Sequence, residues 1–377
     1  MRIQRIKGGS IPPKIVVFNI LKYMADIISI YNKWKTLLPL TEKKQARLAR
    51  RFTVEYNFNS NHMEGNTLTY GQTELLLLFG KVSGEAEMKE FEEMKASNVG
   101  LKMMTEVAKE KLPLTETFIR QLHHTLLRED YTVYTSLPGG MQSSYVVHAG
   151  SYKTRPNSVI TRYGDRFEYA SPEETPALMN DLVNWYNEAE KSGKYTPIEL
   201  AALFHYRYIR IHPFEDGNGR IARLMVNYIL SRHGWPMIVV RNKDKQAYIE
   251  ALHQSDVVVG PVPSDGAHAT LREIRHFMTY FNKLVKTEIS ANIDFITKSA
   301  ENIWWYDGQI VTFRSLNTSK ILFALQENPS ISYEDLTKLI GINKSAIQKQ
   351  INNLIKKGYI QRKNSDKEWY VLITSTI

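Results

Sequence analysis

Apolar residues recur at three- and four-residue intervals along most of the chain, and this is the spacing of an amphipathic helix. The stretches with this spacing are residues 15–38, 42–65, 85–111, 118–126, 172–190, 197–211, 221–230, 248–255 and 267–296. Thr69 and Gln72 add a capping-box pattern at the start of one further helix, which carries residues 74–79. The pattern predicts a mainly α-helical fold with a helical bundle at its centre.

Two segments interrupt the helical spacing. Residues 158–161 and 166–169 are short runs that suit the two strands of a β-hairpin, and Gly164 lies between them. Residues 260–266 are rich in glycine and proline, and they predict a loop between the last two helices of the bundle.

The C-terminal residues, from about Thr318, predict a separate small unit. Three helical patterns are followed by two strand patterns, at residues 321–326, 333–339, 344–357, 359–362 and 369–372. This order is typical of a winged helix-turn-helix. Its third helix has polar residues that suit DNA, namely Lys344, Ser345, Gln348, Lys349 and Asn352. Winged-helix units also serve as protein-contact modules, so DNA and protein remain alternative partners.

Composition narrows the kind of chemistry that the chain can perform. None of the 377 residues is cysteine, which excludes disulfides, thiolate metal sites and a cysteine nucleophile. No run approaches the ~18 apolar residues of a membrane span, so we expect a soluble cytoplasmic protein with no membrane contact. The formal net charge of +10 indicates an anionic partner, and nucleotides, nucleic acids and acidic protein surfaces all fit.

The residues with the strongest chemical signal form one short segment, Ile211 to Arg223, directly ahead of a helical pattern. A turn made of Gly217, Asn218 and Gly219 can direct several backbone N–H groups at one point, where the N-terminus of the next helix also favours an anion. Arg220 and Arg223 lie three residues apart on that helix and can both reach phosphate oxygens. The segment therefore predicts a phosphate-binding site.

Two further side chains of this segment suit catalysis on a phosphate. Asp216 offers a hard oxygen ligand for Mg²⁺, which usually binds one or two carboxylates together with substrate phosphates. His212 is the natural general base. The chain has neither the Gly-x-x-x-x-Gly-Lys-(Ser/Thr) phosphate loop nor the kinase signature set.

The segment matches the signature His-Pro-Phe-x-(Asp/Glu)-Gly-Asn-Gly-Arg-x-x-Arg and therefore resembles the Fic family. The resemblance implies transfer of AMP from ATP to a Ser, Thr or Tyr hydroxyl of a target protein, with self-modification as a further outcome. It implies that His212 deprotonates the hydroxyl and that Asp216 holds Mg²⁺. It also implies that residues 217–219, Arg220 and Arg223 hold the phosphates of ATP.

The resemblance extends to a second, shorter motif. Residues 60–65 fit the pattern (Ser/Thr)-x-x-x-Glu-(Gly/Asn), with Ser60, Glu64 and Gly65 at its three specified positions. Many Fic proteins carry this pattern as a self-inhibitory helix. It implies that Glu64 pairs with Arg223 and takes this arginine away from the γ-phosphate, so that ATP binds in a pose unsuited to in-line attack. The alternative is an ordinary carboxylate at a helix end before a glycine cap.

Two further regions resemble parts of the family's active site. Tyr152, Lys153 and Thr154, with the strand patterns after them, resemble the flap, a hairpin that aligns the target segment by backbone pairing; an ordinary surface hairpin is the alternative. Tyr248 lies where the family often places an aromatic residue near adenine, and packing within the bundle is the alternative.

These patterns predict three regions: an N-terminal helical region with the inhibitory motif at 1–112, a Fic catalytic core at 113–297, and a winged-helix domain at 298–377. The favoured hypothesis is a protein adenylyltransferase, a nucleotidyltransferase that uses ATP and Mg²⁺. Removal of AMP from a modified protein, or transfer of another phosphate-bearing group, is the alternative within enzymology. A DNA-binding regulator that senses nucleotide is the alternative from another class, and homodimer formation is a further hypothesis.

Overall fold

The computed structural model describes residues 26–82, 85–136, 142–160, 166–298, 300–362 and 368–376, and residues 26–35 form its first helical segment. The other helices are α2 (Glu42–His62), α3 (Tyr70–Phe79), α4 (Met88–Glu110), α5 (Glu116–Leu127), α6 (Thr175–Ser192), α7 (Pro197–Ile211), α8 (Asn218–Arg232), α9 (Lys245–Val259), α10 (Pro263–Ala267), α11 (Arg275–Thr297), α12 (Leu316–Glu327), α13 (Tyr333–Ile340) and α14 (Lys344–Lys356), with the short 3-10 helix η1 (Asn242–Asp244). The strands are β1 (Tyr131–Ser136), β2 (Gln142–Val147), β3 (Ser158–Ile160), β4 (Arg166–Glu168), β5 (Ile303–Tyr306), β6 (Gln309–Thr312), β7 (Ile360–Arg362), β8 (Trp369–Val371) and β9 (Thr374–Ser375). The prediction of a mainly helical fold is confirmed.

Helices α7 and α8 form the centre of the bundle and hold the motif between them. Most residues of both helices are buried, including Phe204 and Tyr208 on α7 and Ile229 on α8. A helix that is covered on all sides buries mostly apolar side chains, which explains the dense apolar sequence on either side of the motif. The loop between them is therefore anchored at both ends in the core.

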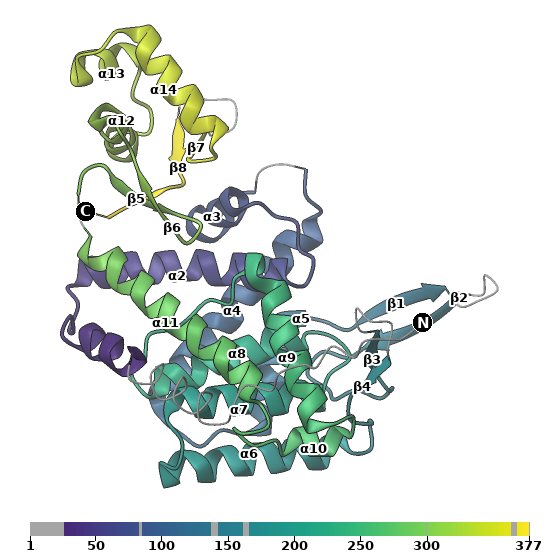
Figure 1. Cartoon of the computed structure of the whole chain (residues 1–377). Coiled ribbons are helices and arrows are strands. Elements are labelled where there is room, and N and C mark those ends of the chain that lie inside the picture. The colour runs from purple at the N-terminus through teal and green to yellow at the C-terminus, as the bar shows by residue number, and fades with distance from the viewer. Residues whose placement is uncertain are drawn as a thin grey trace, which may run out of the picture.

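Two antiparallel hairpins lie beside the bundle. The expected hairpin is present as β3 and β4, with Ser158 paired with Glu168. A second hairpin, β1 and β2, was not predicted, and it projects from the helical body in Figure 1. Within the described residues, no helix has the length and apolar content needed to cross a membrane.

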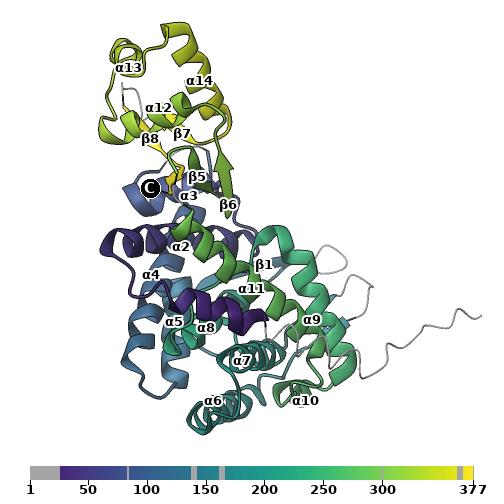
Figure 2. The ribbon, with the colours of Figure 1, turned by 60° about the vertical axis from the view of Figure 1, so that its left-hand side comes forward.

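The C-terminal residues form the expected winged helix-turn-helix around a core of their own. Trp304, Ile321, Leu325 and Ile351 are among its buried residues. Strands β5 and β6, which were not predicted, join β9 in a three-stranded sheet. In both views the unit lies at one end of the helical body next to α2 and α3, and α6 and α10 lie at the other end (Figures 1 and 2).

Two predictions for residues 260–296 were wrong in detail. The predicted loop at 260–266 contains the short helix α10, because Pro263 suits a first helical position and the Gly266 N–H donates to the Val262 carbonyl. The helix expected from residue 267 begins only at Arg275.

Candidate active site

The motif loop has a fixed backbone shape. His212 ends α7 in the left-handed conformation (φ 52°), and Gly217 has φ 76° immediately before α8. The Asn218 side chain closes the loop on itself: its Oδ1 accepts from the Phe214 N–H at 3.0 Å, and its Nδ2 donates to the Phe214 carbonyl at 2.7 Å. The side chain of Asn218 is therefore occupied within the loop. Its backbone N–H, in the first turn of α8, is the group that could bind an anion.

His212 has the environment of a neutral imidazole. Its ring stacks on Tyr169, with the two ring centroids 3.9 Å apart. Burial, together with the nearby Lys153 ammonium, lowers the pKa of His212 to about 3. An imidazole with this pKa is unprotonated near pH 7, which is the state that can accept a proton.

Lys153 lies under the loop and faces inward. Its Nζ donates to the Ile211 carbonyl at 3.1 Å, to the His212 carbonyl at 2.9 Å and to Asn157 Oδ1 at 2.8 Å. The side chain is buried, and burial lowers the pKa of Lys153 to about 8. Its three bonds fix the backbone at the proposed base, so Lys153 is a positioning residue for His212.

The other two residues of the predicted flap also contact the protein. The Tyr152 hydroxyl donates to Glu116 Oε2 at 2.7 Å, and Thr154 donates to Glu215 Oε1 through its N–H and its hydroxyl. These residues precede β3, whose half-exposed Val159 lines the same cavity as His212. Strand β3 therefore borders the cavity, whereas the three side chains before it are bonded to the protein.

The Asp216 carboxylate is held in a defined position. Its Oδ2 accepts from the Tyr131 hydroxyl at 2.7 Å and from Arg220 Nη2 at 3.1 Å, and its Oδ1 accepts from the Gly217 N–H. Burial alone raises the pKa of Asp216, but Arg220 and these hydrogen bonds outweigh it and hold that pKa below the ordinary value. Asp216 is therefore ionised near neutral pH.

The donor set fits Mg²⁺ bound mainly through substrate. Among the described residues, no group of three or more His, Asp or Glu side chains is arranged to hold a metal ion. Asp216 is ionised and its side chain is 44% exposed, and one carboxylate is enough where the substrate supplies phosphate oxygens.

His123 is a positioning residue that the sequence did not reveal. The Gly150 N–H donates to its Nδ1 at 2.8 Å, which leaves its Nε2 to donate to the Asp216 carbonyl at 3.0 Å. The ring also stacks on Phe214, with centroids 3.7 Å apart. His123 and Tyr131 precede the motif by some ninety residues, and no local pattern marks them.

Arg223 and Glu64 form the ion pair that the family resemblance implied. Arg223 Nη2 lies 2.6 Å from Glu64 Oε1, and the same guanidinium donates to the hydroxyl of Ser60 at 3.0 Å and to its carbonyl at 2.9 Å. The Glu64 carboxylate lies over the first turn of α8, since a Cβ placed on Gly219 would be 2.5 Å from Glu64 Oε1. It thus occupies the point at which the loop and helix favour an anion.

The end of α2 is held by η1 and by the first residue of α9. Lys245 Nζ donates to the Met63 carbonyl at 2.6 Å, and the Asn242 N–H donates to Asn59 Oδ1 at 2.9 Å. A cation at a helix C-terminus stabilises the last carbonyl groups. Lys245 therefore steadies the turn that carries Glu64.

A cavity of about 340 Å³ joins most of the predicted site residues. Its lining includes Glu64, His212, Asp216, Gly217, Asn218, Gly219, Arg223, Lys245 and Tyr248. The Tyr248 hydroxyl shares a hydrogen bond of 2.9 Å with His205 Nε2, so its ring has a fixed position in the wall. Arg220 lines a neighbouring cavity instead, which it shares with Asp216 and Tyr131.

The fold and this site define a mainly helical protein with a glycine-containing loop between two buried helices and a winged helix at its C-terminal end. The family model Fic/DOC matches residues 113–230, and a winged helix-turn-helix DNA-binding model matches residues 314–361. The crystal structure of a Fic-domain-containing signalling protein from Bacteroides thetaiotaomicron VPI-5482 is 52% identical, with a TM-score of 0.66 over 71% of this chain and 96% of that one. The chain belongs to the Fic/DOC family.

Relatives with a named activity are more distant. The protein adenylyltransferase fic-1 of Caenorhabditis elegans is 29% identical over 259 residues, which cover 68% of this chain and 44% of the relative. The protein adenylyltransferase Fic of Drosophila virilis is 27% identical over 240 residues, or 60% of this chain and 45% of the relative. The chain thus spans less than half the length of these curated relatives.

Proposed function

We propose that the chain is a protein adenylyltransferase that moves AMP from ATP to a Ser, Thr or Tyr hydroxyl of a target protein and to its own surface. The observation that carries the proposal is a single cavity in which a neutral His212 and an ionised Asp216 meet the N-terminus of α8 and Arg223. The names of the curated relatives support the same activity.

The chemistry needs one proton acceptor and several phosphate ligands. His212 takes the proton of the attacking hydroxyl, whose oxygen forms a bond to the α-phosphorus as the bond to pyrophosphate breaks. The first-turn N–H groups of α8, Arg220 and Arg223 stabilise the charge on the phosphates. Asp216 would hold Mg²⁺, which when bound neutralises phosphate charge. Tyr248 lines the cavity, and in this proposal its ring packs against the adenine of ATP.

Glu64 restrains this site in the proposed mechanism. Its carboxylate pairs with Arg223 and lies over Gly219, so it competes with a phosphate group for the same partners. ATP can then bind only in a pose in which the α-phosphate is not aligned for attack. Ser60 supports the restraint because it holds the Arg223 guanidinium toward α2.

The test removes the proposed base, His212, in a variant that lacks the proposed restraint by Glu64. In the Glu64→Gly background, His212→Ala should lower incorporation of radiolabelled AMP by about 10²-fold or more, while calorimetry shows ATP binding largely intact. His124→Ala removes an exposed imidazole from α5 and serves as the matched control. Undiminished labelling by the His212→Ala variant would reject the assigned role.

Removal of AMP is the second direction of the same chemistry. The Glu64 side chain is 37% exposed in the cavity wall, where a carboxylate can orient a water molecule toward an AMP-modified residue. Incubation of an AMP-modified target with the wild type and with Glu64→Gly separates the directions. Release of AMP that requires Glu64 would favour removal, and release by neither variant would favour transfer.

DNA binding by the winged helix is a candidate of another class. The predicted contact residues Lys344, Ser345, Gln348, Lys349 and Asn352 are all exposed on α14 or at its start. Binding of a labelled duplex to the full chain should weaken steeply with salt and should fall in the Lys349→Glu variant. If the Lys349→Glu variant binds the duplex as tightly as the wild type, this face of α14 does not bind DNA. Homodimer formation and a cytoplasmic location stay predictions.

A further inference from the structure

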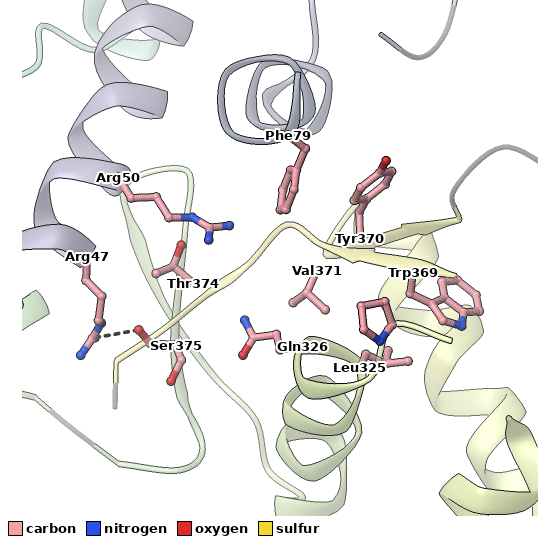
Figure 3. Close-up of a pocket in the computed structure, with 11 residues that line it drawn as sticks. Arg47, Arg50, Phe79, Leu325, Gln326, Trp369, Tyr370, Val371, Thr374 and Ser375 are labelled. Carbon is pink, nitrogen blue, oxygen red and sulfur yellow. Dashed lines mark hydrogen bonds between the residues drawn. The ribbon is translucent and has the colours of Figure 1, made fainter. Parts of the chain in front are cut away.

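A second cavity, of about 410 Å³, lies between the helical body and the C-terminal unit (Figure 3). Helix α2, the end of α3, the end of α12 and the last two strands contribute its walls, and it shares no lining residue with the candidate active site. Residues far apart in the sequence thus meet around one space. Its largest polar contributors are Arg47 and Arg50, which project from the same side of α2.

The cavity has positive charge that nothing in its lining neutralises. No carboxylate is among the described residues that line it. Arg47 Nη2 donates to the Ser375 carbonyl at 2.7 Å, and in the described part of the chain Arg47 has no carboxylate partner. Arg50 lies 3.3 Å from Glu74, but burial raises the pKa of Glu74 to about 8, which weakens this ion pair near pH 7. Both guanidinium groups therefore keep their charge for an anion.

The wall beside the arginines is aromatic. Phe79 and Tyr370 have ring centroids 5.1 Å apart, and the Arg50 guanidinium lies 5.5 Å from the Phe79 centroid. Trp369 and Gln326 also line the cavity, from β8 and from the end of α12 (Figure 3). Phe79 is 38% exposed although it is a large apolar residue. Planar rings next to guanidinium groups are suited to a ligand with both a flat apolar body and an anionic group.

We propose that this cavity is an effector site for a small organic anion with a planar ring, such as a nucleoside phosphate or an aromatic carboxylate, and that its occupancy releases Glu64. The regulatory half of the proposal rests on the proposed function, because it requires Glu64 to restrain AMP transfer. The binding half is independent of any activity.

Helix α2 connects the cavity to the active site. It is one continuous helix from Glu42 to His62, and Arg50 and Ser60 are separated by ten residues, or about 15 Å along its axis. Ser60 is the residue of α2 that holds Arg223. An anion that takes Arg50 from Glu74 and Arg47 from the Ser375 carbonyl draws α2 toward the C-terminal unit. The contacts at the far end of the helix, which hold Arg223 and Glu64 together, are then weakened.

Calorimetry on the full chain tests the binding half. GMP and benzoate represent the two ligand sources, and inorganic phosphate provides the charge without a ring. At least one of the two ring-bearing ligands should bind at a site that the double variant R47Q/R50Q weakens about tenfold or more, since each arginine supplies a charge-assisted contact. Lys44→Gln removes an exposed charge from the same helix and should leave binding unchanged. Binding that is equal in the double variant, no binding of either ligand, or equally tight binding of inorganic phosphate would overturn the proposal.

AMP transfer tests the regulatory half. The ligand that binds should raise self-labelling by the wild type and leave labelling by Glu64→Gly unchanged, because that variant is already released. If the ligand binds but does not change labelling by the wild type, the proposed regulation is overturned and the cavity is still a binding site. Absence of transfer in both proteins, with binding intact, would instead count against the proposed activity.

Discussion

The Glu64→Gly substitution removes one carboxylate and leaves the rest of the site in place. Arg223 keeps its hydrogen bonds to the Ser60 hydroxyl and carbonyl, at 3.0 and 2.9 Å, so the guanidinium retains a position near the cavity. Arg223 loses the Glu64 carboxylate, whose Oε1 lies 2.6 Å from Arg223 Nη2 and competes with a phosphate for the guanidinium. We expect the substitution to raise AMP transfer.

The size of the increase follows from the exposure of the ion pair. A hydrogen bond to a charged group contributes about 1.5–3 kcal/mol, and solvent screening lowers this because the Glu64 side chain is 37% exposed. About 1–2 kcal/mol remains, which corresponds to a roughly 5- to 30-fold larger population of released Arg223. Glu64→Gln keeps the side-chain shape without the charge and should give an intermediate increase.

The assay is the initial rate of radiolabelled AMP incorporation with ATP and Mg²⁺, with ATP affinity measured separately. Glu110→Gly, which removes an exposed carboxylate at the end of α4, is the matched control and should leave the rate unchanged. A rate for Glu64→Gly equal to that of the wild type, or an equal rise in the control, would refute the restraint by Glu64.

Three other substitutions or conditions give distinct outcomes. Lys245→Gln frees the carbonyl at the end of α2 and should raise basal transfer by a smaller factor than loss of Glu64, measured as self-labelling. Lys153→Met leaves buried carbonyl groups without a donor, so the melting temperature should fall by the equivalent of about 1–3 kcal/mol and kcat should fall more than ATP affinity. Burial lowers the pKa of His123 to about 4 and the pKa values of His205 and His212 to about 3. In the unfolded chain these histidines bind protons below about pH 6.5, whereas in the folded chain they stay neutral until the pH is much lower. The raised pKa of Glu74, about 8, acts in the opposite direction through one group, and the three histidines outweigh it. Stability should therefore fall as pH falls from 6.5 toward 4.5, as thermal melts will show; a constant melting temperature would contradict these shifts.

Neutral pH does not release Glu64. Burial alone raises the pKa of the Glu64 carboxyl, but the Arg223 guanidinium outweighs it and holds that pKa below its ordinary value. The carboxylate is therefore ionised throughout the range in which the fold is most stable. If Glu64 restrains transfer as proposed, we expect release to come from a contact that moves α2 or that competes for Arg223, which is the role proposed for the cavity at Arg47 and Arg50.

The sequence predicted those parts of the site that are local. Residues from His212 to Arg223 share one loop and one helix, so their spacing brings His212, Asp216 and Arg223 to one cavity, whereas Arg220 lines the neighbouring one. The capping box at Thr69 and Gln72 is local in the same sense and is present. The hairpin formed by β3 and β4 followed from alternation over a few residues.

Contacts between distant segments could not be predicted in this way. His123 and Tyr131 reach Asp216 only because α5 and β1 pack against the motif loop, and neither residue has a partner within its own element at the site. Lys153 looked like part of an exposed hairpin, but it is buried under His212. The ion pair of Glu64 with Arg223 was implied by the family resemblance alone, because 159 residues separate the two positions.

Mass spectrometry of the chain incubated with ATP and Mg²⁺ tests the assignment most directly. Glu64→Gly should gain the mass of AMP, the wild type should gain much less, and the double variant Glu64→Gly/His212→Ala should gain none. An adduct on the double variant equal to that on Glu64→Gly would contradict the role of His212, and equal adducts on the wild type and Glu64→Gly would contradict the restraint.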